Sequence, residues 1–238
     1  MIEGQSNNPS MTQSLNPSIR QSLNSPQVAV DVVIFTIEAG ELAALLVQVK
    51  SGPFADRWAF PGGLVPVGEA PEATATRELL AQTGIEDVYL EQLRTFGDPG
   101  RDPHAHVVSI AYFALIPSKG HAPANNSKYA SMRWFPVRGL PALAYDHNAI
   151  AEYALSRLRS KLEYTNIVYS LLPREFTLGE LQHLYEIILG RRLDRRNFRK
   201  KILALRLLRP LHRQRCGAHR PAQLYAFIRR QPMMIEML

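Results

Sequence analysis

The sequence lacks several features that would set it apart from an ordinary globular protein. Its only cysteine is Cys216, which excludes an internal disulfide and a zinc site built from cysteines. No segment approaches the ~20 consecutive apolar residues that a helix needs to cross a bilayer. The N-terminus also lacks the basic and then apolar pattern of a secretory signal. These absences predict a cytoplasmic protein without a membrane partner.

Acidic residues are scarce in the last part of the chain. Residues 146–238 hold 18 Lys+Arg against 8 Asp+Glu, a net charge of +10, whereas residues 1–145 hold 10 against 13, a net charge of −3. A basic module attached to a near-neutral one is typical of proteins that bind polyanions. Core-type periodicity within the basic segments favours nucleic acid over a membrane surface. The 238-residue length allows one large or two ordinary domains.

Large apolar side chains are rare in residues 1–27, which are rich in Ser, Asn, Gln and Pro and are expected to be disordered. The pattern then changes to apolar and β-branched runs. Residues 28–37 and 42–50 flank a glycine turn and predict a hairpin. Further predicted strands are residues 88–96, 106–116 and 133–137.

The most informative stretch is a glycine-rich turn followed by a predicted helix. Pro71 suits the first turn of a helix and Gly84 suits the residue just past its end, so the spacing predicts a helix over residues 71–83. Gly62 and Gly63 let the backbone approach a ligand closely, and the N-terminus of a following helix favours anions. The segment is therefore suited to hold a pyrophosphate.

The same helix carries an incomplete metal-binding face. Glu78, Ala81 and Gln82 are spaced i, i+3, i+4 and share one side of the helix. Three carboxylates there would hold hard divalent cations that bridge phosphate groups. Only Glu78 is charged, so we expect no metal site and no catalytic residue beyond a residual Glu78. A pyrophosphate can then be held without being cut.

This spacing resembles the Nudix box, although Ala81 and Gln82 stand where that family carries paired glutamates. The resemblance implies an α+β fold, with sheets between helices in an α/β/α sandwich. It also implies a structural pair of Glu69 with Arg77 that braces the loop against the helix; a surface ion pair beside a solvated Glu78 is the alternative interpretation. The marker residues that agree are Gly63, Glu69, Arg77, Glu78, Leu79, Gly84 and Ile85.

A loop dense in proline and glycine, residues 96–106, carries Arg101 and His104, which we expect to face a phosphate. A solvent-facing turn is the alternative. The segment GRDPHAHVVSIAYFALI is similar to one in Nudix domains that act on ADP-ribose in NAD metabolism, but His104-Ala105 departs from the Arg-Gly pair common there. The candidate ligand-binding residues are Arg57, Gly62, Gly63, Glu78, Arg101 and His104.

The segment from Asp146 to Tyr164 predicts a long amphipathic helix that links the two modules. After it, Thr177 and Glu180 form a capping box at the start of a second helix, and Gly190 suits the end of that helix. The buried stripe of the linking helix is predicted to be Ile150, Ala154, Leu158 and Leu162.

Another helix is predicted to begin near Asp194, a good N-cap, with Phe198, Ile202 and Leu205 facing inward. Its outward face is basic and holds an asparagine, as a helix-turn-helix needs to read a major groove. The strand-like sequence about Cys216 predicts a β wing; a merely solvated basic helix is the alternative. The candidate DNA-binding residues are Arg195, Arg196, Asn197, Arg199, Lys200, Arg213, Arg215 and Arg220.

The two halves together resemble one family, the Nudix-related transcriptional regulators of NAD metabolism, NrtR. The segment FTLGELQHLYEIILGRRLDRRNFRKKIL and the incomplete Nudix box carry this resemblance. It implies a Nudix-like sensing domain at residues 28–160 and a winged helix-turn-helix domain at residues 161–238. It further implies a homodimeric repressor of NAD biosynthesis or salvage genes that binds palindromic double-stranded DNA, with ADP-ribose as effector and no required cofactor.

Two other functions remain open from the sequence. A hydrolase of ADP-ribose or a related dinucleotide would use the basic part for dimerisation; the retained Glu78 supports it, and Ala81 and Gln82 oppose it. Weak residual hydrolysis is compatible with the regulator. An RNA-associated pyrophosphatase would bind RNA through the basic part, but no aromatic stacking motif occurs there.

Overall fold

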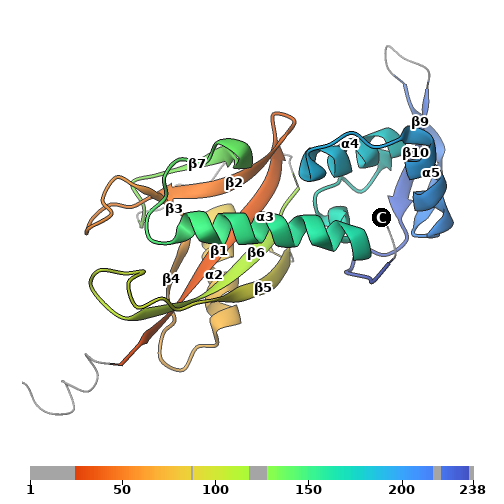
Figure 1. Cartoon of the computed structure of the whole chain (residues 1–238). Coiled ribbons are helices and arrows are strands. Elements are labelled where there is room, and N and C mark those ends of the chain that lie inside the picture. Colours follow the sequence, from red (N-terminus) through yellow and green to blue (C-terminus); the bar gives the residue numbers. More distant parts are fainter. Residues whose placement is uncertain (1–24, 87, 118–127, 217–220, 236–238) are drawn as a thin grey trace, which may run out of the picture.

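The computed structural model describes residues 25–86, 88–117, 128–216 and 221–235 of the 238-residue chain. Figure 1 shows a large sheet covered by helices, which we call the large body, and a smaller group of helices with a short sheet, the small body. One long helix runs from the first toward the second. The tail expected over residues 1–27 lies outside the described residues as far as residue 24.

The large body is built on one seven-stranded mixed sheet. Its strands are β1 (Gln27–Glu38), β2 (Glu41–Gln48), β3 (Trp58–Ala59), β4 (Gly62–Leu64), β5 (Tyr89–Phe96), β6 (Val107–Leu115) and β7 (Ser131–Pro136). β1 is central: it pairs antiparallel with β2 and β4, and parallel with β6. β5 extends the sheet beyond β6, while β3 and β7 both pair with β2.

The predicted hairpin and the three further strands are confirmed within a residue or two. The turn between β1 and β2 is Ala39-Gly40, and both residues have positive φ, 49° and 81°. Two-residue turns of this kind match the right-handed twist of the paired strands. The parallel pairing of β1 with β6 was not predicted, because hydrophobic periodicity identifies a strand but not its partner.

Both faces of the sheet are covered: residues 29–36 of β1 are buried on both sides, and all of them are apolar except Asp31 and Thr36. The helices of the large body are α2 (Pro71–Thr83), η2 (Val137–Gly139) and α3 (His147–Tyr164). Val32 packs in one buried cluster with Leu79 of α2, whereas its neighbour Val33 belongs to a second cluster with Leu158 of α3. The expected α/β/α sandwich is therefore confirmed, with α2 on one face and α3 on the other (Figure 1).

The small body follows α3 and consists of η3 (Ile167–Ser170), β8 (Phe176–Thr177), α4 (Leu178–Leu189), α5 (Arg195–Ala204), β9 (Leu208–Arg215) and β10 (Ala222–Phe227). Its three strands pair in the order β8-β10-β9. The capping box is confirmed, because Thr177 accepts from the Glu180 N–H at 3.1 Å and Glu180 accepts from the Thr177 N–H at 2.8 Å. Asp194 caps α5 by accepting from the Asn197 N–H at 2.8 Å.

The two bodies share one core. The buried stripe predicted for α3 is confirmed, and it belongs to a cluster that also contains Phe35 of the sheet, Ile188 of α4 and Phe227 of β10. Apolar packing therefore continues without a break from the sheet into the small body. The stripe consists of Ile150, Ala154, Leu158 and Leu162.

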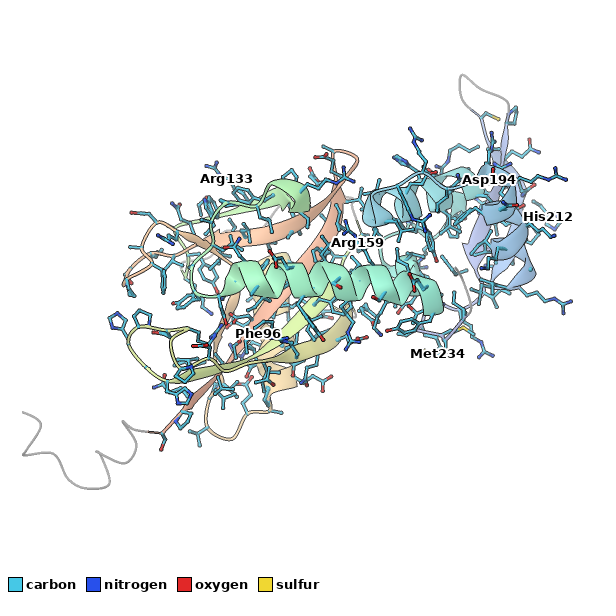
Figure 2. The ribbon with its side chains drawn as sticks, viewed as in Figure 1. Phe96, Arg133, Arg159, Asp194, His212 and Met234 are labelled. Atoms are coloured by element: carbon cyan, nitrogen blue, oxygen red, sulfur yellow. The ribbon has the colours of Figure 1, made fainter. Side chains whose placement is uncertain are left out.

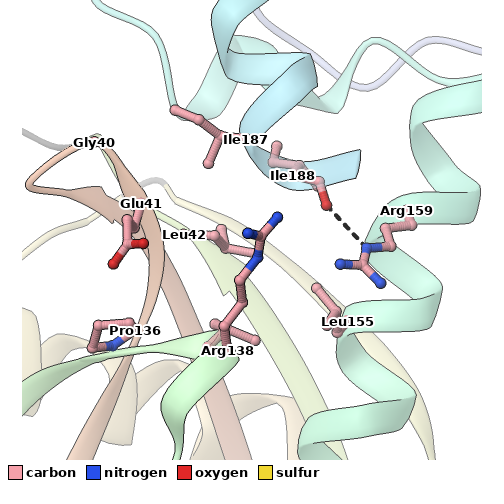
Figure 3. A pocket seen from close by; sticks show the side chains of 10 residues that line it. Gly40, Glu41, Leu42, Pro136, Arg138, Leu155, Arg159, Ile187 and Ile188 are labelled. Carbon is pink, nitrogen blue, oxygen red and sulfur yellow. Dashed lines mark hydrogen bonds between the residues drawn. The ribbon is translucent and has the colours of Figure 1, made fainter. Parts of the chain in front are cut away.

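Polar contacts also join the bodies, beside a cavity of about 150 Å³ (Figure 3). Arg159 of α3 donates from Nε to the carbonyl oxygen of Ile188, 2.9 Å away, at the C-terminal end of α4. Arg138 of η2 reaches the same helix end: a Cβ added to Gly190 would lie 2.8 Å from its Nη2. Cations are favoured at the negative end of a helix. Arg159 therefore holds α4 against α3, and the Arg138 guanidinium lies beside the same helix end.

Candidate functional site

A cavity of about 470 Å³ opens in the large body beside β1, β4 and the N-terminal end of α3. Four of the predicted ligand-binding residues line it, namely Gly62, Gly63, Arg101 and His104. Arg57 does not line it and is exposed, so the structure gives no support for Arg57 as a ligand-binding residue. Aromatic side chains also border the cavity and would suit the base or ribose of a nucleotide. They are Phe60, Tyr129 and Tyr145.

The two glycines of β4 form a tight wall of the cavity. A Cβ on Gly62 would lie 2.3 Å from the Val30 carbonyl oxygen and 2.7 Å from an Asp31 carboxylate oxygen, so no larger residue fits without moving backbone. The Tyr129 hydroxyl accepts from the Gly62 N–H at 3.2 Å and donates to the Gly62 carbonyl oxygen at 3.1 Å. A single hydroxyl thus holds both backbone polar groups of Gly62.

Arg101 is placed differently from the expectation that it faces a phosphate. Its side chain is only 4% exposed, and Nη2 donates to Asp146 at 2.7 Å and to Asp31 at 3.2 Å. A buried guanidinium needs carboxylate partners to offset the loss of water. Arg101 therefore fastens the 96–106 loop to β1 and to the start of α3. His104 remains exposed at the rim of the cavity.

Asp31 is the centre of this buried network. Ser109 donates to it at 2.6 Å, and His147 Nε2 lies 3.4 Å from its other oxygen. Burial alone would raise the pKa of Asp31, but His147, Ser109 and Arg101 outweigh that effect and lower it to about 2. His147 is oriented in turn by the Phe60 N–H, which donates to Nδ1 at 2.9 Å. Asp31 was not among the predicted site residues, although a lone aspartate in the apolar run VAVDVVIF was a signal.

The start of α3 departs from ordinary helix geometry where it meets the cavity. Asp146 occupies the N-cap position but makes no capping hydrogen bond, because its carboxylate is engaged by Arg101. The preceding residue, Tyr145, has a φ of 53°, which is strained for a side chain of this size. Strained residues of this kind concentrate at functional sites. The cavity is thus connected directly to the N-terminal end of α3.

The predicted helix over residues 71–83 is confirmed, and Glu78 on it is buried against a cation from the protein itself. Both Glu78 oxygens lie 2.8 Å from Lys128 Nζ, which also donates to the Gly62 carbonyl oxygen at 2.6 Å. Gln82 is buried and neutral, and Ala81 is exposed. In the described part of the chain, no group of three or more His, Cys, Asp or Glu side chains is placed to hold a metal ion. The donor set at Glu78 does not fit a divalent cation.

The implied pair of Glu69 and Arg77 is present in the structure. Arg77 donates from Nε to Oε1 at 3.2 Å and from Nη2 to Oε2 at 3.3 Å, so the contact is bidentate. Arg77 also lies 3.3 Å from Glu78. Because Arg77 is about half exposed, the pair orients the loop before α2 more than it stabilises the fold.

A second candidate surface lies at the far end of the small body, where Figure 2 shows Asp194 and His212 well away from Phe96. Phe198 and Ile202 of α5 are buried as expected, which turns the opposite side of the helix outward, while Leu205 is the C-cap residue and is only partly buried. Arg199 is half-buried, and its Nε is shielded from solvent. Within the described residues, none of the basic side chains of α5 forms an ion pair. The exposed polar residues of this face are Arg195, Arg196, Asn197, Lys200 and Lys201.

The strands β9 and β10 form the predicted wing. Two of its predicted DNA-binding arginines have partners inside the protein: Arg213 pairs with Glu175, and Arg215 pairs with Glu180 of the capping box. Both arginines remain exposed. A phosphate would therefore compete with a carboxylate for each of them. Arg220 lies outside the described residues.

Comparison with known proteins assigns both bodies to known families. Residues 25–158 match the family described as NUDIX domain, and residues 168–227 match the family described as NrtR DNA-binding winged helix domain. A protein of Acinetobacter baylyi named ADPR responsive transcriptional repressor NtrR is 37% identical over 206 residues, which cover 85% of this chain and 82% of that protein. The chain belongs to the NrtR family.

Solved structures agree with this assignment to the NrtR family. The crystal structure of Shewanella oneidensis NrtR complexed with a 27mer DNA is 32% identical, covers 84% of this chain and 93% of that chain, and has a TM-score of 0.73. A cocrystal structure of the NUDIX domain of Shewanella oneidensis NrtR complexed with ADP ribose is 31% identical, covers 62% of this chain and 96% of that chain, and has a TM-score of 0.52. The large body is thus the Nudix domain, and the small body is the winged helix domain.

No helix in the described part of the chain is both long and apolar enough to cross a membrane.

Proposed function

We propose that this NrtR-family protein is a DNA-binding transcriptional repressor of NAD biosynthesis or salvage genes that releases its operator when its Nudix domain binds ADP-ribose. The exposed basic face of α5 supplies the surface for the major groove, and the wing adds phosphate contacts. The protein acts as a homodimer on a palindromic operator. Its two winged helix domains then meet half-sites about one helical turn, ~34 Å, apart.

One observation carries the coupling between ligand and DNA: α3 is bonded to the cavity at one end and to α4 near the other. Asp146, at its start, is engaged by Arg101 in the cavity network, and Arg159, toward its end, donates to Ile188 of α4. A ligand that shifts the cavity network acts on the same rigid helix that positions the winged helix domain. A small rotation of that domain in each protomer is enough to spoil the match to both half-sites.

In this proposal the Nudix domain binds its ligand without cleaving it. Two of the three positions that would carry metal-binding carboxylates are Ala81 and Gln82, and the remaining Glu78 faces Lys128. No cofactor is required in this proposal, and ADP-ribose is the effector. The role of Arg101 is to position the cavity rather than to contact a phosphate.

Calorimetric titration of ADP-ribose into the free protein and into the protein–operator complex tests the proposal. For a hundredfold loss of operator affinity, the ligand must bind the DNA-incompetent arrangement about 2.7 kcal/mol better, which lies within the usual range of allosteric coupling. Linkage then requires the operator to weaken ADP-ribose binding by the same factor. Equal affinities in the two titrations would eliminate the sensor mechanism.

The retained Glu78 and its neighbours favour one competing function, hydrolysis of ADP-ribose. Product release with Mg²⁺ at ordinary enzyme rates, about 1 to 1000 per second, would establish that function instead. We expect no release on this scale. The double variant Ala81→Glu with Gln82→Glu restores the carboxylate pattern and should recover some hydrolysis.

A further inference from the structure

Lys128 holds an unusual position beside the Nudix helix. Its Nζ lies 2.8 Å from both oxygens of Glu78 and 2.6 Å from the carbonyl oxygen of Gly62. The Glu78 side chain is 7% exposed, whereas that of Lys128 is 44% exposed and lines the ligand cavity. A buried carboxylate and the mouth of the cavity are therefore joined by a single ammonium group.

The surrounding backbone fits an ammonium at this point. A Cβ on Gly63 would lie 3.1 Å from Nζ and 3.3 Å from Glu78 Oε1, so the glycine leaves room for the ion pair. The two Glu78 oxygens belong to one carboxylate and can share an N–H, so the three N–H groups of the ammonium can serve Glu78, the Gly62 carbonyl oxygen and a phosphate oxygen. Nζ also lies 5.3 Å from the centre of the Tyr129 ring, whose hydroxyl holds the Gly62 peptide. Glycine backbone, carboxylate and aromatic ring together fix one cation.

A divalent cation would need a different set of ligands. Mg²⁺ takes near-octahedral oxygen ligands at about 2.0–2.1 Å and normally more than one carboxylate or phosphate. Glu78 offers one carboxylate, and Ala81 and Gln82 add no charge. Without a cation, however, Glu78 would repel the pyrophosphate of a nucleotide in the cavity. Arg77 lies 3.3 Å from Glu78 but does not line the cavity, whereas Lys128 does, so Lys128 is the cation placed between Glu78 and such a ligand.

We propose that the Lys128 ammonium replaces the divalent cation at Glu78 and bridges this carboxylate to the pyrophosphate of ADP-ribose, so that the ligand binds without metal. This inference rests on the proposed function, which supplies the ligand. A lysine neutralises charge and donates hydrogen bonds, but a single positive charge does not generate a metal-bound hydroxide. Lys128 thus binds the ligand and gives no help in cleaving it.

The test is calorimetric titration of ADP-ribose into the full-length protein, in EDTA and in Mg²⁺. We expect the unmodified protein to bind with the same affinity in both. Lys128→Met should weaken binding in EDTA by about ten- to a hundredfold, the effect of losing a hydrogen bond to a charged group. The matched control is Lys161→Ala, which removes a lysine paired with Glu91 at 2.6 Å outside the cavity. This control should keep full affinity.

Lys128→Met alone leaves the buried Glu78 carboxylate without this partner and could destabilise the fold. A second variant separates that effect from the loss of a ligand contact. Lys128→Met with Glu78→Gln removes both charges and should still bind ADP-ribose weakly in EDTA, since no cation faces the pyrophosphate. Full affinity in this double variant would overturn the inference and leave Lys128 a structural neutraliser. Metal-dependent binding by the unmodified protein would overturn it as well, while leaving the proposed function intact. Failure to bind ADP-ribose in either buffer would instead overturn the proposed function.

Discussion

Charged side chains are arranged in opposite ways at the two functional ends of the molecule. In the cavity of the Nudix domain, Asp31, Glu78 and Arg101 are buried, and each has a partner of opposite charge within hydrogen-bonding distance. On the outward face of α5, Arg196 and Lys200 are exposed, and in the described part of the chain neither forms an ion pair. The buried charges at the cavity have partners within the protein, whereas the exposed charges of α5 would find theirs in a polyanion.

The difference follows from the cost of removing charge from water. A buried ion without a partner is destabilising by several kcal/mol, so the fold itself must supply the partner. An exposed arginine keeps its water and can exchange it for a DNA phosphate with release of counterions. We therefore expect changes in the cavity to act on stability and changes in α5 to act on DNA affinity.

The largest effect should come from Gly62 in the cavity wall. Gly62→Ala places a Cβ 2.3 Å from a backbone oxygen, and we expect a loss of about 3 kcal/mol or more in the free energy of unfolding. Gly139→Ala is the matched control, because a Cβ at that glycine meets nothing within 4 Å. Urea unfolding of the two variants measures the difference. Equal stability would show that the wall is not rigid.

A smaller effect is expected from the exposed face of α5. Arg196→Ala should weaken operator binding by about 1–3 kcal/mol if it contacts a base directly, and should leave ADP-ribose affinity unchanged. Fluorescence anisotropy with labelled operator at fixed salt measures the first quantity. Arg133→Ala, on β7 of the Nudix domain (Figure 2), is the control for loss of one positive charge. Unchanged DNA affinity in Arg196→Ala and Arg195→Ala would move the recognition surface elsewhere.

The smallest effect concerns pH. The pKa of Asp31 is lowered from 3.8 to about 2 in the folded protein, so its stabilising effect is present above about pH 4 and is lost as the pH falls toward 2. This contribution is at most on the order of 2 kcal/mol. Urea unfolding at about pH 5 and about pH 3 should show it in the unmodified protein and a flatter profile in Asp31→Asn. If the free energy of unfolding depended on pH identically in both proteins, ionised Asp31 would not contribute to stability.

Local signals made the helices predictable from the sequence. Pro71 and Gly84 bound α2, and the capping residues Thr177 and Asp194 mark the starts of α4 and α5, because each of these residues acts within one turn of the helix that it bounds. The exposed basic face of α5 follows directly from where Phe198 and Ile202 point.

The interior of the cavity was not predictable in the same way, because its contacts join distant parts of the chain. Arg101 meets Asp31 across 70 residues and Asp146 across 45, and Lys128 meets Glu78 across 50. No periodicity links such positions, and they come together only through the parallel pairing of β1 with β6 and the return of the chain to α3. For this reason the sequence did not predict the two carboxylate partners of Arg101.

The apolar cluster that runs from the sheet into the winged helix domain has a thermodynamic consequence. Phe35 and Phe227 belong to the same buried cluster, and α3 is common to both parts, so the winged helix domain has no core separate from that of the Nudix domain, which adds a second cluster beneath α2. The chain should therefore melt in one cooperative transition, and ADP-ribose bound in the Nudix domain should raise the melting temperature of the DNA-binding domain equally. Two separate peaks in scanning calorimetry would contradict this.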